Sequence, residues 1–205
     1  MYKKPVIVFE GIDCSGKTTQ ISFVSKYLKE RKIPFIKFRE PGGSSNSEKI
    51  RNLLLNNKSN LNIKTDLLLY LAARAENIEK IIKINKSRKI ILIDRFIDST
   101  YAYQHYAMGI DKRIIKLLNN FVTENIKADF TFLSTVNKKN LIKRLKNRKK
   151  LNRYDSFKIN FYLKAQKGFI SIAKNKRKYL VVNSNLDLKK NFHQITNKLI
   201  ELKLR

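Results

Sequence analysis

The stretch Val6–Gln20, "VIVFEGIDCSGKTTQ", decides the fold. Four apolar residues and an acid are followed by Gly11–Thr18, which fits the pattern G-x-x-x-x-G-K-[ST]. Ile21, Val24 and Leu28 then repeat at helical spacing. The pattern predicts a buried strand, a glycine turn and the start of an amphipathic helix, which is the context that a phosphate-binding loop requires.

The residue types of this loop have a direct chemical meaning. Gly11 and Gly16 permit backbone angles that turn N–H groups inward, and the following helix adds the positive end of its dipole. Lys17 would pair with the β- and γ-phosphates, and the Thr18 hydroxyl would ligate Mg²⁺. We therefore expect a nucleoside triphosphate here. The candidate ATP- and phosphate-binding residues are Gly11, Ile12, Asp13, Cys14, Ser15, Gly16, Lys17, Thr18 and Thr19.

The rest of the chain alternates short apolar runs with longer segments of helical period. This alternation predicts an α/β fold, a five-stranded parallel sheet between two layers of helices, as one domain over residues 1–205. The expected strands are Val6–Glu10, Phe35–Arg39, Ile90–Asp94, Asp129–Ser134 and Tyr179–Asn183. The expected helices are Lys17–Arg31, Ser47–Asn56, Thr65–Asn85, Ser99–Tyr106, Asp111–Asn125, Lys138–Lys146, Ser156–Lys174 and Leu186–Leu202.

Composition limits the class of protein. No apolar run approaches the length of a membrane span, and the lone Cys14 excludes an intramolecular disulfide, so we expect a cytoplasmic protein. The net charge of +29 suggests either nucleic-acid binding or a solvated basic surface set by coding bias. Because Lys residues are spread along the whole length, the second interpretation is favoured and no specific nucleic acid is expected.

Three further segments are informative together: "FREPGG" (Phe38–Gly43), "YLAAR" (Tyr70–Arg74) and "DRFIDSTYAYQ" (Asp94–Gln104). With the phosphate loop they resemble the thymidylate kinase family of P-loop nucleoside-monophosphate kinases, over nearly the whole chain. The resemblance implies transfer of the ATP γ-phosphoryl group to dTMP, giving dTDP and ADP in dTTP biosynthesis, with Mg²⁺ as cofactor. It also implies a homodimer. The apolar faces of Thr65–Asn85 and Ser99–Tyr106 could form the dimer interface, but burial of these faces in the protein core would explain them equally well.

The resemblance also assigns residues to dTMP. Tyr70, where the family usually has Phe, would stack on thymine, while Arg74, Thr100 and Gln104 would contact the edge of the base. Tyr103 would crowd the sugar 2′ position. Tyr70 and Arg74 lie four apart on a predicted helix, so they share one face.

The remaining dTMP assignments concern its phosphate and sugar. The resemblance implies that Arg39 and Arg95 grip the acceptor phosphate and that Asp13 accepts a hydrogen bond from the 3′-hydroxyl. Asp94 would either hold Mg²⁺ through water or orient Arg95.

The densest basic tract, Lys138–Arg153, holds nine Lys or Arg residues in sixteen. By resemblance it contains a lid at about residues 147–155, with Arg148 and Arg153 as the candidates for its catalytic arginines. Alternatively it is a solvated helix face or a nucleic-acid patch. The expected catalytic residues are Lys17, Asp94, Arg95, Arg148 and Arg153.

Two other functions are open from the sequence. A deoxynucleoside kinase would use Glu40 as a base to activate a 5′-hydroxyl, but the Arg39 and Arg95 pair makes sense only for an acceptor that already carries a phosphate. A basic nucleic-acid-binding module would show affinity that falls steeply with salt and would have no use for Arg74, Thr100 or Tyr103.

Overall fold

The computed structural model describes residues 4–149, 151–174 and 177–204. Its described residues form one five-stranded, all-parallel sheet in the order β2-β3-β1-β4-β5. The strands are β1 (Val6–Glu10), β2 (Phe35–Arg39), β3 (Ile90–Asp94), β4 (Phe130–Thr135) and β5 (Tyr179–Asn183). The predicted fold class is confirmed. Strand β4 starts and ends one residue later than expected, and the carboxylate of Asp129, directly before it, accepts a hydrogen bond from the Val6 backbone N–H at 2.8 Å.

Helices account for most of the remaining chain. The α-helices are α1 (Lys17–Glu30), α2 (Ser45–Leu55), α3 (Ile63–Asn77), α4 (Lys83–Asn85), α5 (Ile97–Thr100), α6 (Lys112–Thr123), α7 (Lys138–Lys146), α8 (Ile159–Ala173) and α9 (Leu188–Glu201). Two π-helical segments, η1 (Ile78–Ile82) and η2 (Tyr101–Ala107), continue α3 and α5, and a 3₁₀ turn, η3 (Arg153–Ser156), precedes α8. The expected single helices over Thr65–Asn85 and Ser99–Tyr106 are therefore each interrupted by a wider turn, a feature that often accompanies functional sites.

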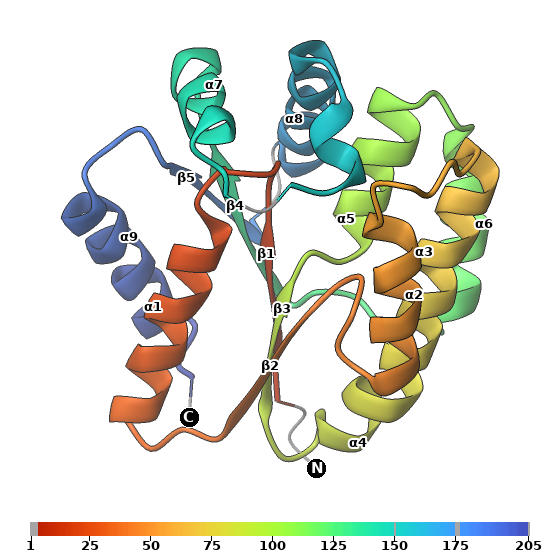
Figure 1. Cartoon of the computed structure of the whole chain (residues 1–205). Coiled ribbons are helices and arrows are strands. Elements are labelled where there is room, and N and C mark those ends of the chain that lie inside the picture. The colour runs from red at the N-terminus through yellow and green to blue at the C-terminus, as the bar shows by residue number, and fades with distance from the viewer. Residues whose placement is uncertain (1–3, 150, 175–176, 205) are drawn as a thin grey trace.

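The helices cover the sheet on both sides, as Figure 1 shows. On one side α1 and α9 pack Val24, Leu28 and Ile195 against Phe9 and Phe132 of the strands. On the other side lie α3, α6 and α8. This three-layer arrangement directs the carboxyl ends of all five strands to one edge, where the phosphate loop begins.

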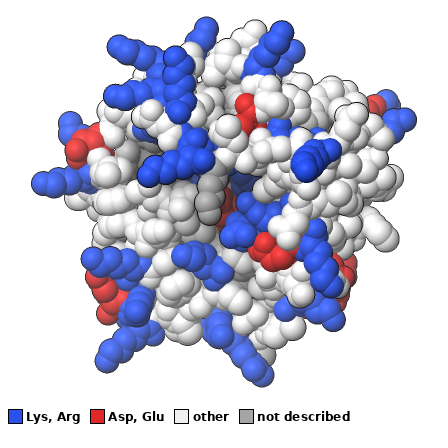
Figure 2. All heavy atoms as spheres, viewed as in Figure 1, with Lys and Arg blue, Asp and Glu red and all other residues white. Residues whose placement is uncertain are grey.

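The molecular surface is basic. Figure 2 shows Lys and Arg distributed around the whole visible face, with acidic residues in small groups and a hollow near the centre. This even distribution is what a general basic surface predicts. Within the described ranges, no helix combines the length and the apolar character needed to cross a bilayer.

Candidate active site

The phosphate loop joins β1 to α1 with two glycines in left-handed or related conformations. Gly11 has φ 136°, and a Cβ there would lie 2.4 Å from the Ser134 carbonyl oxygen. Gly16, with φ 99°, directly precedes the first residue of α1. Residues that carry a Cβ are strained at such backbone angles, whereas glycine is not. The motif's two fixed glycines are thus explained by the backbone path.

Lys17 starts α1 and turns back over the loop. Its Nζ donates to the Ile12 carbonyl at 2.9 Å, and its side chain is buried. Burial, together with the nearby Arg95 charge, lowers the pKa of Lys17 to about 8. A phosphate group arriving in the loop would favour the charged ammonium.

An open cleft of about 550 Å³ lies beside this loop. Thr18 and Thr19 line it with exposed side chains, and Asp94, Arg39 and Arg95 line it from the ends of β2 and β3. Asp94 Oδ1 is buried and has no hydrogen-bond partner among the described residues. A buried carboxylate oxygen facing a hydroxyl-lined cleft suits a hydrated divalent cation, since oxygen ligands and waters are what Mg²⁺ prefers.

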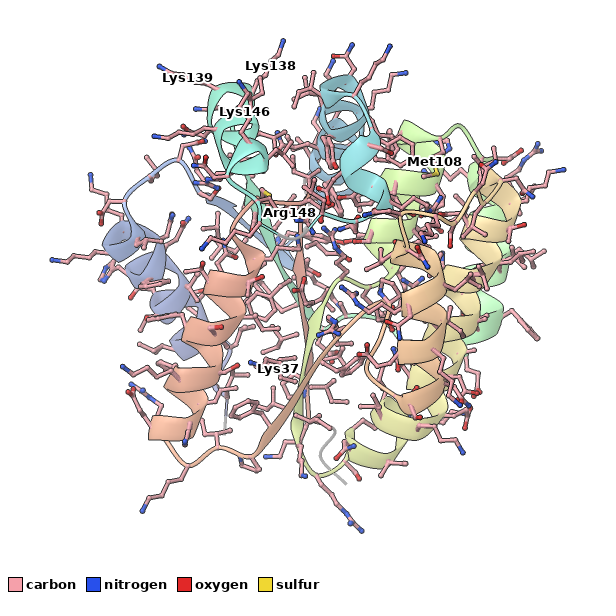
Figure 3. The ribbon with its side chains drawn as sticks, viewed as in Figure 1. Lys37, Met108, Lys138, Lys139, Lys146 and Arg148 are labelled. Carbon is pink, nitrogen blue, oxygen red and sulfur yellow. The ribbon has the colours of Figure 1, made fainter. Side chains whose placement is uncertain are left out.

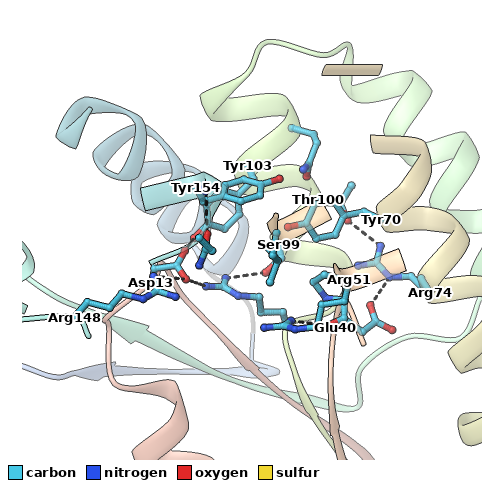
Figure 4. Close-up of a pocket in the computed structure, with 15 residues that line it drawn as sticks. Asp13, Glu40, Arg51, Tyr70, Arg74, Ser99, Thr100, Tyr103, Arg148 and Tyr154 are labelled. Atoms are coloured by element: carbon cyan, nitrogen blue, oxygen red, sulfur yellow. Dashed lines mark hydrogen bonds and ion pairs between the residues drawn. The ribbon is translucent and has the colours of Figure 1, made fainter. Parts of the chain in front are cut away.

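A second, narrower pocket opens from this cleft toward α3, α5 and η2, and Figure 4 draws its lining. The cavity volume is about 80 Å³. The lining residues are Asp13, Glu40, Pro41, Arg51, Leu55, Tyr70, Arg74, Arg95, Ser99, Thr100, Tyr103, Gln104, Arg148, Asn152 and Tyr154.

Arg74 anchors this pocket although it is almost entirely buried, with 2% of its surface exposed. Its Nε donates to Glu40 Oε2 at 2.7 Å, and its Nη1 donates to Thr100 and Asn119. Its Nη2 donates to the Phe96 carbonyl at 2.8 Å. Four of the five guanidinium N–H groups are thereby engaged within the described residues.

Glu40, the candidate base of a deoxynucleoside kinase, is the ion-pair partner of Arg74. Its other oxygen accepts from Asn77 at 3.4 Å, and its side chain is buried. Burial raises the pKa of Glu40, and the Arg74 charge opposes that rise. The geometry gives Glu40 a structural partner, which removes the main argument for the deoxynucleoside kinase interpretation.

Asp13, Arg95 and Tyr103 meet where the pocket joins the cleft. Arg95 Nη2 lies 3.2 Å from Asp13 Oδ1, and the Tyr103 hydroxyl donates to Asp13 Oδ2 at 2.8 Å. Burial opposes ionisation of Asp13, but the charges of Arg95 and Lys17 outweigh it and lower its pKa to about 2. Arg95 itself has φ 69°, a strained conformation for a non-glycine residue that is frequent at functional sites.

The base-contacting candidates lie together as expected. Tyr70, Thr100 and Gln104 all line the pocket with Arg74. Gln104 Nε2 donates to Asp66 Oδ1 at 3.0 Å, and Thr100 accepts from Arg74. The pocket's polar side chains thus bind one another where a ligand would compete for them.

The two lid candidates behave differently. Arg148 lies inward, above the phosphate loop, while Lys138 and Lys139 of α7 project away from the molecule (Figure 3). The Nη1 of Arg148 donates to Asp155 at 2.7 Å and lies 3.8 Å from Asp13. Residue 150 of the expected lid lies outside the described residues.

Arg153 does not reach the phosphate loop. Its guanidinium pairs with the buried carboxylate of Asp66 and donates to the Leu54 carbonyl at 2.9 Å, and within the described structure it lines neither the cleft nor the pocket. Arg144, and not Arg153, lies at the phosphate loop. Its guanidinium donates to the Cys14 carbonyl at 3.0 Å and to Ser184, and it lines the cleft.

Arg39 also lies further out than the sequence suggested. Its side chain is 53% exposed, pairs with Glu48 at 3.1 Å, and lines the cleft and not the inner pocket. Arg51 of α2 lines both cavities and donates to the Pro41 carbonyl at 2.6 Å.

The site residues that sequence reasoning missed include Arg51, Asp66, Arg144, Asn152 and Tyr154. Arg51 shares a helical face with Ser47 and Leu54, but the burial of these two residues is visible only in the structure. Asp66 gave a usable signal, since it is four residues before Tyr70. Tyr154 lay in the lid tract without any distinguishing pattern.

Comparisons with known proteins agree on one family. The family model for thymidylate kinase matches residues 9–195. The thymidylate kinase of Sulfurihydrogenibium sp. is 41% identical over 185 residues, covering 89% of this chain and 90% of that protein. That of Thermosipho africanus is 37% identical over 190 residues, covering 92% and 94%. The crystal structure of thymidylate kinase from Ehrlichia chaffeensis superposes with a TM-score of 0.76 at 35% identity, covering 97% of this chain and 99% of that one.

Proposed function

The chain belongs to the thymidylate kinase family and transfers the γ-phosphoryl group of ATP to dTMP, giving dTDP and ADP, and we propose how its own residues carry out this reaction. The family excludes the nucleic-acid-binding module as the main function. The observation that carries our assignment is that the buried Arg74 lines one pocket together with Tyr70, Thr100 and Gln104.

On the donor side, the loop amides and Lys17 bind the β- and γ-phosphates of ATP. The Thr18 hydroxyl and Asp94 fit a magnesium ion, which when bound neutralises charge on the transferred phosphoryl group. Lys17 is poised for this role because nucleotide binding needs to replace only its bond to the Ile12 carbonyl.

On the acceptor side, the remaining N–H of Arg74 donates to a thymine carbonyl, and the Tyr70 ring packs against the base. Gln104 reaches the edge of the base after exchanging its bond to Asp66. Thr100 positions Arg74 through their mutual hydrogen bond at 2.8 Å.

The acceptor phosphate lies between the pocket and the cleft. Arg95, Arg51 and Arg148 line both cavities, and Arg39 adds a charge at the rim of the cleft. Asp13 accepts from the 3′-hydroxyl, and the Tyr103 hydroxyl, held by Asp13, restricts space at the 2′ position. Since phosphoryl transfer needs mainly alignment and charge neutralisation, this convergence of arginines supplies what the reaction requires.

Residues 147–155 act as a lid. Tyr154 and Asn152 close the narrower pocket, which we call the acceptor pocket. Arg148 and Arg144 hold the phosphate loop. Arg153 is a positioning residue in this proposal, because its partner Asp66 also accepts from the Tyr154 hydroxyl at 2.9 Å.

The protein forms a homodimer through α3 and α6. Exposed apolar side chains occur on both helices, which pack together: Ile63, Leu68, Ile114, Leu117 and Phe121. Helix η2 is unsuitable for this role because Ala102, Tyr103 and Gln104 are buried. The lone cysteine and the free nucleotide substrates favour a cytoplasmic location.

The test is ADP release from ATP·Mg²⁺ with dTMP, dUMP, UMP, AMP and thymidine offered in parallel to the wild type and to Arg74→Lys. We expect turnover with dTMP well above the rest, and an Arg74→Lys variant with a raised KM for dTMP and little change in KM for ATP. Unchanged dTMP kinetics in Arg74→Lys would contradict the assignment of Arg74.

A further inference from the structure

A third cavity lies behind the acceptor pocket, and we call it the rear cavity. Its volume of about 560 Å³ matches the 550 Å³ of the nucleotide cleft. The segment from Phe96 to Gln104 separates the two sites. It directs Phe96, Asp98 and Tyr101 to the rear cavity, and Ser99, Thr100 and Tyr103 to the acceptor pocket.

The rim of the rear cavity is basic. Lys116, Lys127, Arg177 and Lys178 line it with exposed side chains. Its two acids are Glu10, which accepts from the backbone N–H groups of Phe96 and Ser99, and Asp98, which accepts from the Tyr179 hydroxyl at 2.7 Å.

The remaining lining suits an organic ring. Tyr101 and Tyr179 offer aromatic surface, and the exposed Asn120 offers an amide with both a donor and an acceptor. Four cations around a cavity with aromatic and amide walls are suited to a ligand that carries phosphate.

The walls of the rear cavity are bonded directly to the acceptor site. Asn119 lines the rear cavity, and its Oδ1 accepts from Arg74 Nη1. Phe96 lines it as well, and its carbonyl accepts from Arg74 Nη2 at 2.8 Å. Glu10 accepts from the Ser99 hydroxyl at 2.6 Å, and Ser99 lines the acceptor pocket. A ligand that displaces Asn119 or Phe96 would therefore disturb hydrogen bonds that hold Arg74.

We propose that the rear cavity binds a small phosphate-bearing molecule, a nucleotide or a free polyphosphate, and that its occupancy changes the affinity of the acceptor pocket for dTMP. The two parts are separable. The binding part stands on the cavity alone, while the coupling part rests on the role proposed for Arg74.

Calorimetry tests the binding part with the active site already filled. CTP and inorganic pyrophosphate are each titrated into protein saturated with ADP and dTMP. Lys116→Glu/Arg177→Glu reverses charge at the rim, and Asn120→Trp fills the mouth without a charge change. Lys37→Glu/Lys190→Glu is the matched control, since both lysines are exposed and line none of the three cavities.

We expect the wild type and the control to bind one equivalent of CTP, and both cavity variants to bind it at least tenfold more weakly. Pyrophosphate bound with the same variant pattern would also support the proposal and would identify phosphate as the recognised group. The absence of saturable binding, displacement by further ADP, or equal affinity in cavity variants and control would overturn it.

Steady-state kinetics test the coupling part. With the probe that binds, we expect the KM for dTMP to change at least twofold in the wild type and the control and to stay constant in Asn120→Trp, with kcat little altered. A KM that ignores the bound probe would overturn the coupling while leaving the active-site assignment intact. Failure of that assignment would appear separately, as dTMP kinetics unchanged in Arg74→Lys.

Discussion

The acceptor pocket and the nucleotide cleft differ in whether their polar side chains already have hydrogen-bond partners. In the pocket, polar side chains bind one another: Arg74 with Glu40 and Thr100, and Asp13 with Tyr103. In the cleft, Thr18 and Thr19 are exposed, and Asp94 keeps a buried oxygen without a partner in the described structure.

The difference teaches how each substrate gains its affinity. Groups of the pocket are held in place before dTMP arrives, so little side-chain entropy is lost on binding, although some protein hydrogen bonds must be exchanged. Groups of the cleft gain partners only when the nucleotide and its cation bind. The acceptor side should therefore govern the stability of the fold, and the donor side should depend on ligands.

The largest effect is expected from Arg74→Ala. It leaves Glu40 buried without its cation, so the free energy of unfolding should fall by about 3–5 kcal/mol. Arg39→Ala, in an exposed pair, should change it by less than about 0.5 kcal/mol. Urea denaturation of both variants makes the comparison, and a loss of under about 1 kcal/mol in Arg74→Ala would show that the pocket network is not structural.

The pH dependence of stability tests Glu10, which lines the rear cavity and accepts a hydrogen bond from Ser99 of the acceptor pocket. Burial, with Asp98 nearby, raises the pKa of Glu10 from 4.5 to about 7. Because the folded state then binds the proton more tightly than the unfolded state, the stabilisation is complete below pH 4.5 and is lost as the pH rises through 7.

The resulting change can be measured by comparing two proteins. Between pH 5 and 7.5 the wild type should lose roughly 2 kcal/mol relative to Glu10→Gln, in which the titrating group is absent. Thermal or urea unfolding across that window gives the difference. Parallel pH profiles of the two proteins would show that Glu10 does not titrate there.

Asp66→Asn should give the next largest effect. Asp66 is buried and accepts from Gln104, Tyr154 and Arg153, so it joins the pocket to the lid. Loss of its charge should cost about 2 kcal/mol of stability and raise the KM for dTMP more than that for ATP. Glu30→Gln, in an exposed pair, is the control and should change neither quantity. Equal changes in both KM values would argue against a specific link to the acceptor side.

The last prediction concerns the donor side. With the pKa of Lys17 lowered to about 8, the free enzyme loses the ammonium as the pH rises through 8. The kcat/KM for ATP should then fall about tenfold per pH unit, while kcat holds to higher pH because bound phosphate restores the charge. Lys17→Arg, which stays charged, should have lower activity and a flat profile over this range. A wild-type kcat/KM that stays flat to pH 10 would contradict the expected role of Lys17.

The sequence predicted the fold well because its strands are short apolar runs bounded by polar residues. Four of the five strands have the predicted limits, and the fifth is displaced by one residue. The glycine loop was equally readable, since both Gly11 and Gly16 occupy backbone angles that other residues avoid.

Side-chain direction was the part that the sequence could not give. Arg148 and Arg153 each follow an asparagine in the same basic tract, but one faces the phosphate loop and the other turns to Asp66. The π-helical segments η1 and η2, which continue α3 and α5, also change which residues share a helical face. Partners from distant segments decide such orientations, and local patterns do not contain them.

Hydrogen exchange measured segment by segment tests the central claim most directly. The account predicts that the amides of residues 66–74 exchange slowly in the free protein and change little when dTMP is added, while those of residues 11–19 become protected only with a magnesium-bound, non-hydrolysable ATP analogue. Rapid exchange of residues 66–74 that becomes slow only with dTMP would contradict the claim that the acceptor side is built before its substrate arrives.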